Sequence, residues 1–180
     1  EESLRLKSGS GYVTHLEMMN ERLNSLALSV ANTNQINMYG FLADQYKDNY
    51  FRGVFRIQQG IGFGKDFVTP NIKVVQGVIM KKFAGSSFSK RIWKNANKLA
   101  TSLKDTLTVG LIRGESIDQM TKRLLTRVEA SQSRARTLIR TESARIYEEA
   151  TKDAYKECGI EQYIYLATLD RKTSLICQEL

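Results

Sequence analysis

The chain has very few of the residues that break helices, form covalent frameworks or ligate metals. Its 180 residues include one proline, Pro70, two cysteines, Cys158 and Cys177, and one histidine, His15. Because proline is the strongest helix breaker, its near absence favours long helices. Two cysteines are too few for a disulfide scaffold, and with a single histidine they do not supply the ligand set of a zinc site. We therefore expect no bound metal and no cofactor.

Long apolar runs are also missing. No stretch approaches the roughly 20 apolar residues that are needed to span a bilayer, and no basic-then-apolar signal peptide opens the chain. The sequence thus predicts no membrane span and a protein that is made and kept in a reducing, cytoplasmic setting. Because the chain begins at Glu1 and stops at Leu180, we expect a longer natural protein.

Charge of one sign predominates in the middle of the chain. The net charge is +8, and the segment from Lys81 to Arg145 holds 15 Lys and Arg against 5 Asp and Glu, whereas residues 146–180 hold 4 against 7. Such an excess favours an acidic partner, with nucleic acid ahead of membrane; a plain solvated helical face is the alternative. The candidate DNA-binding residues are Lys90, Arg91, Lys94, Lys98, Arg113, Lys122, Arg123, Arg127, Arg134 and Arg136.

The first third of the chain has apolar residues at helical spacing and predicts two helices, Glu2 to Asn34 and Ile36 to Gln58. The second is unusually aromatic. One interpretation of its aromatic stripe is helix-helix packing, and the other is a partner-binding surface, because aromatic residues are enriched at interface anchors. The stripe consists of Tyr39, Phe41, Tyr46, Tyr50, Phe51 and Phe55.

Glycine and serine mark the boundaries of the following helices. After a loop that ends near Pro70, a short apolar helix is expected over Asn71–Lys82. Ser87 or Ser89 then caps a long helix that Gly114 ends. Ser116 begins a compact amphipathic helix in which Ile117, Met120 and Leu124 face inward.

A last long helix is expected from Glu129 to Cys158, with Gly159 as its C-terminal residue. Glu142 interrupts its otherwise apolar face, and a buried carboxylate needs a partner, which Arg145 supplies three residues later. Beyond Gly159, Gln162 to Thr168 predicts a strand that is followed by a turn and a final helical turn.

The predicted fold is therefore mainly α, with an elongated multi-helix body and a small α+β C-terminal cap of one or two strands. We expect three regions: an N-terminal helical, partner-binding region (1–84), a central helical core (85–159) and a strand-turn-helix cap (160–180) that the end of the chain cuts short.

Five short motifs follow one another in the C-terminal half. They are Phe88 to Trp93 (FSKRIW), Gly110 to Ser116 (GLIRGES), the Arg140-Thr141-Glu142 triplet, Gly159 before a tyrosine-containing strand, and Asp170, Thr173 and Cys177 at the spacing Asp-x-x-Thr-x-x-x-Cys. In this order they resemble the phage-Mu-F-like family of minor head proteins. The resemblance covers residues 85–180 well, and departs from the family where Lys172 replaces an arginine and Ser174 replaces a cysteine.

The resemblance implies a minor virion component of a tailed bacteriophage that is assembled in the host cytoplasm and lies inside the capsid near the portal. The implied partners are the portal protein, then the major capsid or scaffolding protein, and double-stranded DNA, which is contacted nonspecifically. A nucleic-acid-binding helical protein without any capsid role is the first alternative. An enzyme built on the C-terminal motif is the second.

We expect no catalytic residue. Cys177 lacks a nearby base, because the only histidine lies in a distant helical segment. The charged residues of the motifs are interpreted as a structural lock in which Asp170 reaches the guanidinium of Arg140 or Arg145 and holds the terminal strand to the long helix. The predicted lock consists of Arg140, Glu142, Arg145, Asp170, Thr173 and Cys177.

Overall fold

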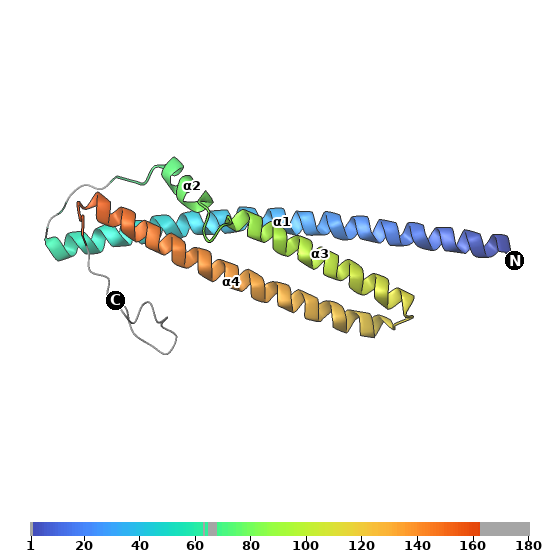
Figure 1. Ribbon diagram of the computed structural model, residues 1–180. Helices are drawn as coiled ribbons and strands as arrows, with labels where there is room; N and C mark the ends of the chain where they lie inside the picture. The colour runs from blue at the N-terminus through green and yellow to red at the C-terminus, as the bar shows by residue number, and fades with distance from the viewer. Residues whose placement is uncertain (1, 63, 65–67, 163–180) are drawn as a thin grey trace.

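The computed structural model describes residues 2–62, 64 and 68–162, with side chains from residue 17 onward. This part of the chain forms four helices: α1 (Glu2–Ile61), α2 (Ile72–Met80), α3 (Phe88–Ile112) and α4 (Ile117–Glu157). They build an elongated body in which α3 and α4 form an antiparallel hairpin beside α1, and α1 projects past the tip of that hairpin (Figure 1). The mainly α prediction is confirmed, whereas the predicted strand and the turns after it lie outside the described residues.

The sequence-based prediction of two helices in the first third of the chain is wrong, because α1 is one continuous helix of 60 residues. No proline or glycine stands between Thr33 and Met38 to end it. Polar residues there cost a helix only a few tenths of a kcal/mol each. Gln35 at this point accepts hydrogen bonds from Ser89 and Trp93 of α3, so the presumed junction is a point of contact between helices.

The second correction concerns α4, which runs without interruption from Ile117 to Glu157 where two helices were expected. The absence of glycine and proline over this range explains the continuity. The other expected boundaries agree with the structure to within three residues. Ser87 and Ser116 cap α3 and α4, and the Ser116 cap is reciprocated by Gln119. Gly114 and Gly159 follow the helices with φ of 64° and 73°, a conformation that glycine adopts without steric cost.

The core lies along a seam between α1 and α4, with contributions from α2 and α3. On α1 the buried residues recur every four positions after a first step of seven: Ala31, Met38, Leu42, Tyr46, Tyr50 and Val54. They pack with Leu138, Ile146, Ala150 and Ala154 of α4, with Val75 and Ile79 of α2, and with Phe88 and Ile92 of α3. The helix α1 and the hairpin thus share one core. The expected division of the chain into three regions stays a prediction.

Candidate functional site

The most enclosed charged group among the described residues is the carboxylate of Glu142 on α4. Its side chain is only 1% exposed, and both of its oxygens are engaged. Arg145, three residues further along the same helix, donates from Nε to Oε2 at 2.9 Å, and Arg91 of α3 donates to Oε1 at 2.9 Å. The predicted pairing of Glu142 with Arg145 is present in the structure, and Arg91 adds a second cation.

The same two arginines also bind backbone carbonyls at the end of α2. Arg145 donates to the carbonyl oxygens of Val78 at 2.8 Å and Ile79 at 3.2 Å, and Arg91 donates to the carbonyl oxygen of Phe83. The last carbonyls of a helix lack intrahelical partners and carry partial negative charge. The Arg91–Glu142–Arg145 cluster therefore fastens the C-terminal end of α2 and the turn after it to α3 and α4.

The cluster has the geometry of a structural contact, with a covered carboxylate between two guanidinium groups. Arg140, which was also assigned to the lock, is exposed on α4. Its side chain forms no hydrogen bond or ion pair with another described residue. Asp170, Thr173 and Cys177 lie outside the described residues, so their part in the lock stays a prediction. Sequence inspection missed Arg91 as a partner of Glu142, because a contact across 51 residues has no local signature.

The predicted DNA-binding residues separate into two groups. Arg91 is bound to Glu142, and Arg123 is bound to Glu115 at 2.6 Å, so both have acidic partners within the chain. The others are exposed on α3, on the hairpin turn and on the first half of α4: Lys90, Lys94, Lys98, Arg113, Lys122, Arg127, Arg134 and Arg136. On α3, Lys90, Lys94 and Lys98 border a shallow hollow beside Trp93.

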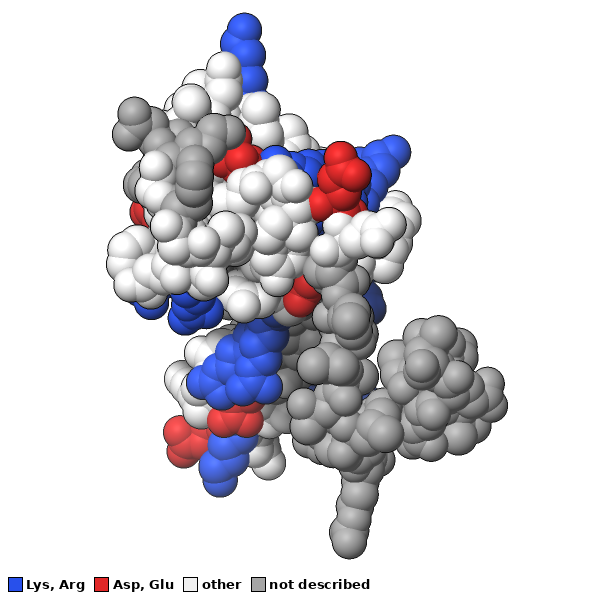
Figure 2. Space-filling model, turned by 90° about the vertical axis from the view of Figure 1, so that its left-hand side faces the viewer, with Lys and Arg blue, Asp and Glu red and all other residues white. Residues whose placement is uncertain are grey.

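The end of the molecule that lies opposite the hairpin turn carries both basic and acidic side chains. Figure 2 looks onto the end where α1 and α4 finish, and there basic side chains lie beside acidic ones. Ion pairs in this region include Lys81 with Glu149 at 2.7 Å. The hydrogen bond to Lys81 lowers the pKa of Glu149 from its ordinary value, against the opposing effect of partial burial. This end therefore does not form one continuous basic face.

The aromatic stripe of α1 is also divided by the structure. Tyr46 and Tyr50 are buried, with their rings stacked 6.4 Å apart, and they belong to the core. Tyr39 and Phe51 are half-buried against the core, whereas Phe41 and Phe55 are 50% and 57% exposed. Two of the six residues thus offer large aromatic surface to a partner, and Tyr46 and Tyr50 do not.

Phe41 borders an apolar groove of about 360 Å³ where α1 faces the hairpin. Val30 and Met38 of α1, Ile92 and Leu99 of α3, and Leu138 and Ile139 of α4 contribute to its walls. Val30 and Ile139 remain 45% and 42% exposed. Apolar surface of this kind, lined by three helices, is typical of protein-protein contact sites.

Two other kinds of functional feature, a metal-binding cluster and a membrane-spanning helix, are not found among the described residues. No group of three or more His, Cys, Asp or Glu side chains in residues 2–62, 64 and 68–162 is placed to hold a metal ion. Within the same part of the chain, no helix combines the length and hydropathy that crossing a membrane requires.

Comparisons with known proteins support the resemblance drawn from the motifs. Residues 101–180 match the family described as Phage Mu protein F like protein. Over 166 residues the chain is 25% identical to Minor head protein GP7 of Bacillus phage SPP1, covering 90% of this chain and 47% of that protein. Over 180 residues it is 28% identical to NAD(+)--arginine ADP-ribosyltransferase EFV of Enterococcus faecalis (strain ATCC 700802 / V583), covering 94% of this chain and 37% of that protein.

The chain thus spans less than half the length of each of these relatives. No solved structure shows a significant match. Residues 101–180, which include the Arg140-Thr141-Glu142 triplet, match this family, so the resemblance to the phage-Mu-F-like minor head proteins is confirmed over that segment.

Proposed function

We propose that the chain is part of a minor head protein that acts in the head assembly of a tailed bacteriophage, docks on the portal and contacts packaged DNA inside the capsid. The family match over residues 101–180 carries this proposal, and the similarity to a minor head protein supports it. The helical hairpin contributes two surfaces suited to macromolecular partners, one apolar and one basic.

Docking on the portal protein is assigned to the apolar groove. Phe41 stands at its border, half-exposed, and a large aromatic side chain at the edge of a groove is a typical anchor. The test is the affinity of the chain for purified portal protein. Phe41→Ser should weaken binding by roughly thirtyfold, the effect of losing an anchor worth about 2 kcal/mol.

Ile36→Ser is the matched control, because Ile36 lies on the same helix, is 62% exposed and does not line the groove. This variant should bind as the wild type does. Equal losses in both variants would remove the groove from the docking role. If wild-type protein fails to bind portal, the alternative of a nucleic-acid-binding helical protein without a capsid role is favoured instead.

DNA contact is assigned to Lys90, Lys94 and Lys98, which are exposed on one face of α3. Their four-residue spacing places them along a line of about 12 Å, since a helix rises about 1.5 Å per residue. Neutralising about three phosphates should make log K fall with log salt with a slope near −3. The triple Lys→Gln variant should lose most of that slope, which fluorescence anisotropy on duplex DNA measures.

A triple variant with Lys73, Lys152 and Lys156 changed to Gln removes the same charge from other exposed positions. It should retain the slope. A wild-type affinity that does not change between low and physiological salt would exclude phosphate contact altogether.

We further propose that this chain is not itself an enzyme, although one relative is named as an ADP-ribosyltransferase. The covered position of Glu142 between Arg91 and Arg145 supports a structural role for the most enclosed carboxylate described. Incubation with biotinylated NAD⁺ and an arginine-rich acceptor should give no labelling above that of a heat-denatured sample. Labelling that depends on the folded chain would overturn this proposal.

A further inference from the structure

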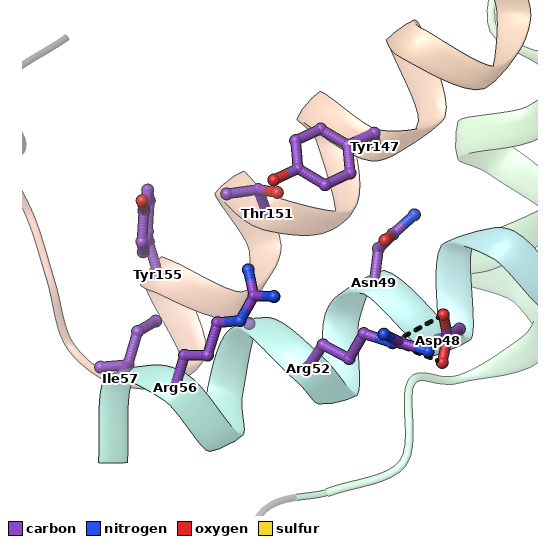
Figure 3. A pocket seen from close by; sticks show the side chains of 9 residues that line it. Asp48, Asn49, Arg52, Arg56, Ile57, Tyr147, Thr151 and Tyr155 are labelled. Atoms are coloured by element: carbon purple, nitrogen blue, oxygen red, sulfur yellow. Dashed lines mark hydrogen bonds and ion pairs between the residues drawn. The ribbon is translucent and has the colours of Figure 1, made fainter. Parts of the chain in front are cut away.

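A second cleft lies between the C-terminal part of α1 and the second half of α4, at the opposite end of the molecule from the hairpin turn. It has a volume of about 520 Å³, within the range of roughly 300–1,000 Å³ that is usual for ligand pockets. Figure 3 shows the side chains around it. The lining residues are Asp48, Asn49, Arg52, Gly53, Arg56, Ile57, Tyr147, Thr151 and Tyr155.

Helical spacing on both walls aligns these residues. Arg52 and Arg56 stand one turn apart on α1, and Tyr147, Thr151 and Tyr155 stand one turn apart on α4. At the floor, Gly53 has no side chain, and a Cβ placed there would lie 2.8 Å from the Cβ of Ala154. This close approach of the two backbones brings the polar side chains of both helices to the same opening.

The two arginines have different surroundings. Arg52 donates from Nε to Asp48 at 2.9 Å and turns along its own helix. Arg56 has no hydrogen bond or ion pair with any described residue, and in Figure 3 its guanidinium extends across the cleft toward Thr151. After the Asp48 charge offsets that of Arg52, the lining retains one positive charge, on Arg56.

Hydrogen-bond donors accompany this charge. The hydroxyl of Tyr147 points toward Thr151 in Figure 3, and both hydroxyls lie on the side that the Arg56 guanidinium faces. Neither hydroxyl is bonded to another residue in the described part of the chain. Ile57 and the ring of Tyr155 add apolar wall. A guanidinium with two hydroxyls beside it matches the acceptor geometry of a carboxylate.

We propose that this cleft binds the side-chain carboxylate of an acidic segment in a protein partner, with Arg56 as the ion-pair donor and Thr151 and Tyr147 as hydroxyl donors. The apolar wall fits the methylene stem of such a side chain. DNA fits less well, because Asp48 lies in the cleft and one unpaired cation does not follow a phosphate backbone. The proposal is independent of the portal and DNA roles, which use the groove and α3.

The test is an NMR titration of the isotope-labelled chain with acetyl-Ala-Glu-Ala-amide. The Nε–H signal of Arg56 and the amide signals of Tyr147 and Thr151 should shift saturably. The peptide with Gln in place of Glu should bind at least about tenfold more weakly, because a charge-assisted hydrogen bond is lost. Arg56→Gln should have the same effect on the Glu peptide, and Arg22→Gln, at an exposed site elsewhere on α1, should have none.

Inorganic phosphate distinguishes a small-anion site from a protein-binding site. Phosphate that binds more tightly than the Glu peptide would overturn the assignment to a protein carboxylate. Equal binding of the Glu and Gln peptides, or an Arg56→Gln variant with unchanged affinity and an unchanged circular dichroism spectrum, would overturn the site itself. Because Arg56 is exposed, its replacement leaves the core intact.

Discussion

The hydroxyl of Tyr46 on α1 donates a hydrogen bond to Oδ2 of Asp153 on α4 at 2.7 Å, across 107 residues of sequence. Tyr46 is fully buried, whereas the Asp153 side chain is 23% exposed. Burial, the bond to Asp153 and the nearby negative charge raise the pKa of Tyr46 well above its usual value. The phenol therefore stays protonated, and its hydrogen bond joins the two longest helices near the C-terminal end of α4.

Replacing Tyr46 with Phe removes this bond while keeping the ring in the core. The free energy of unfolding should fall by about 1.5–3 kcal/mol, the usual value for a hydrogen bond to a charged group. Urea denaturation followed by circular dichroism measures the change. Tyr39→Phe, half-buried on the same helix, should alter stability by less than about 0.5 kcal/mol. Equal effects would show that the bond to Asp153 contributes nothing of its own.

The Arg91–Glu142–Arg145 cluster should respond strongly to loss of its carboxylate. Glu142→Ala leaves the guanidinium of Arg145, which is 6% exposed, buried without a counter-charge, at a cost of roughly 3–5 kcal/mol. Thermal and urea unfolding report the loss. Glu129→Ala, at an exposed position of the same helix, serves as the control and should have little effect. A destabilisation below about 1 kcal/mol for Glu142→Ala would contradict the fastening role.

Gly53 and Gly40, both within α1, should respond oppositely to substitution with alanine. A Cβ at Gly40 meets nothing within 4 Å, so Gly40→Ala should stabilise the chain by about 1 kcal/mol through helix propensity. At Gly53 the new Cβ would lie 2.8 Å from that of Ala154, and α1 would be pushed from α4.

We expect Gly53→Ala to destabilise by about 1–3 kcal/mol. The double variant Gly53→Ala, Ala154→Gly removes the clash and should recover part of this loss, which a double-mutant cycle measures. Additive effects of the two changes would argue against the close approach of α1 and α4.

The pair of Lys81 and Glu149 predicts a specific pH dependence. The pKa of Glu149 is lowered from 4.5, first by the hydrogen bond from Lys81. A carboxylate with a lowered pKa in the folded state contributes stability above its unfolded pKa, and this contribution is lost as the pH falls through the folded value.

Lys81→Met should therefore destabilise the chain at pH 7 by up to about 1 kcal/mol, since the pair is partly exposed. The difference from the wild type should shrink as the pH is lowered below about 4.5. Urea denaturation at a series of pH values provides the measurement. A difference that is constant with pH would mean that Lys81 acts through packing.

Predictions from the sequence were correct where the relevant interactions are local. Ser87 and Ser116 were placed at helix starts because a cap bonds to amides within three residues. The pair of Glu142 and Arg145 was expected for a similar reason, since residues three apart share one helix face. The expected breaks near Asn34 and Glu129 were wrong, because weak local propensity does not interrupt a helix that tertiary contacts support.

The sequence by itself determined the helical class, most of the helix ends and the motifs through which residues 101–180 resemble the phage-Mu-F-like proteins. Only the tertiary structure decided that Tyr46 and Tyr50 enter the core while Phe41 and Phe55 face outward, and that Arg91 binds Glu142. The physical reason is distance along the chain. Helix caps and same-face pairs depend on neighbours within one turn, whereas the burial of an aromatic ring or the partner of a charge depends on how separate helices pack.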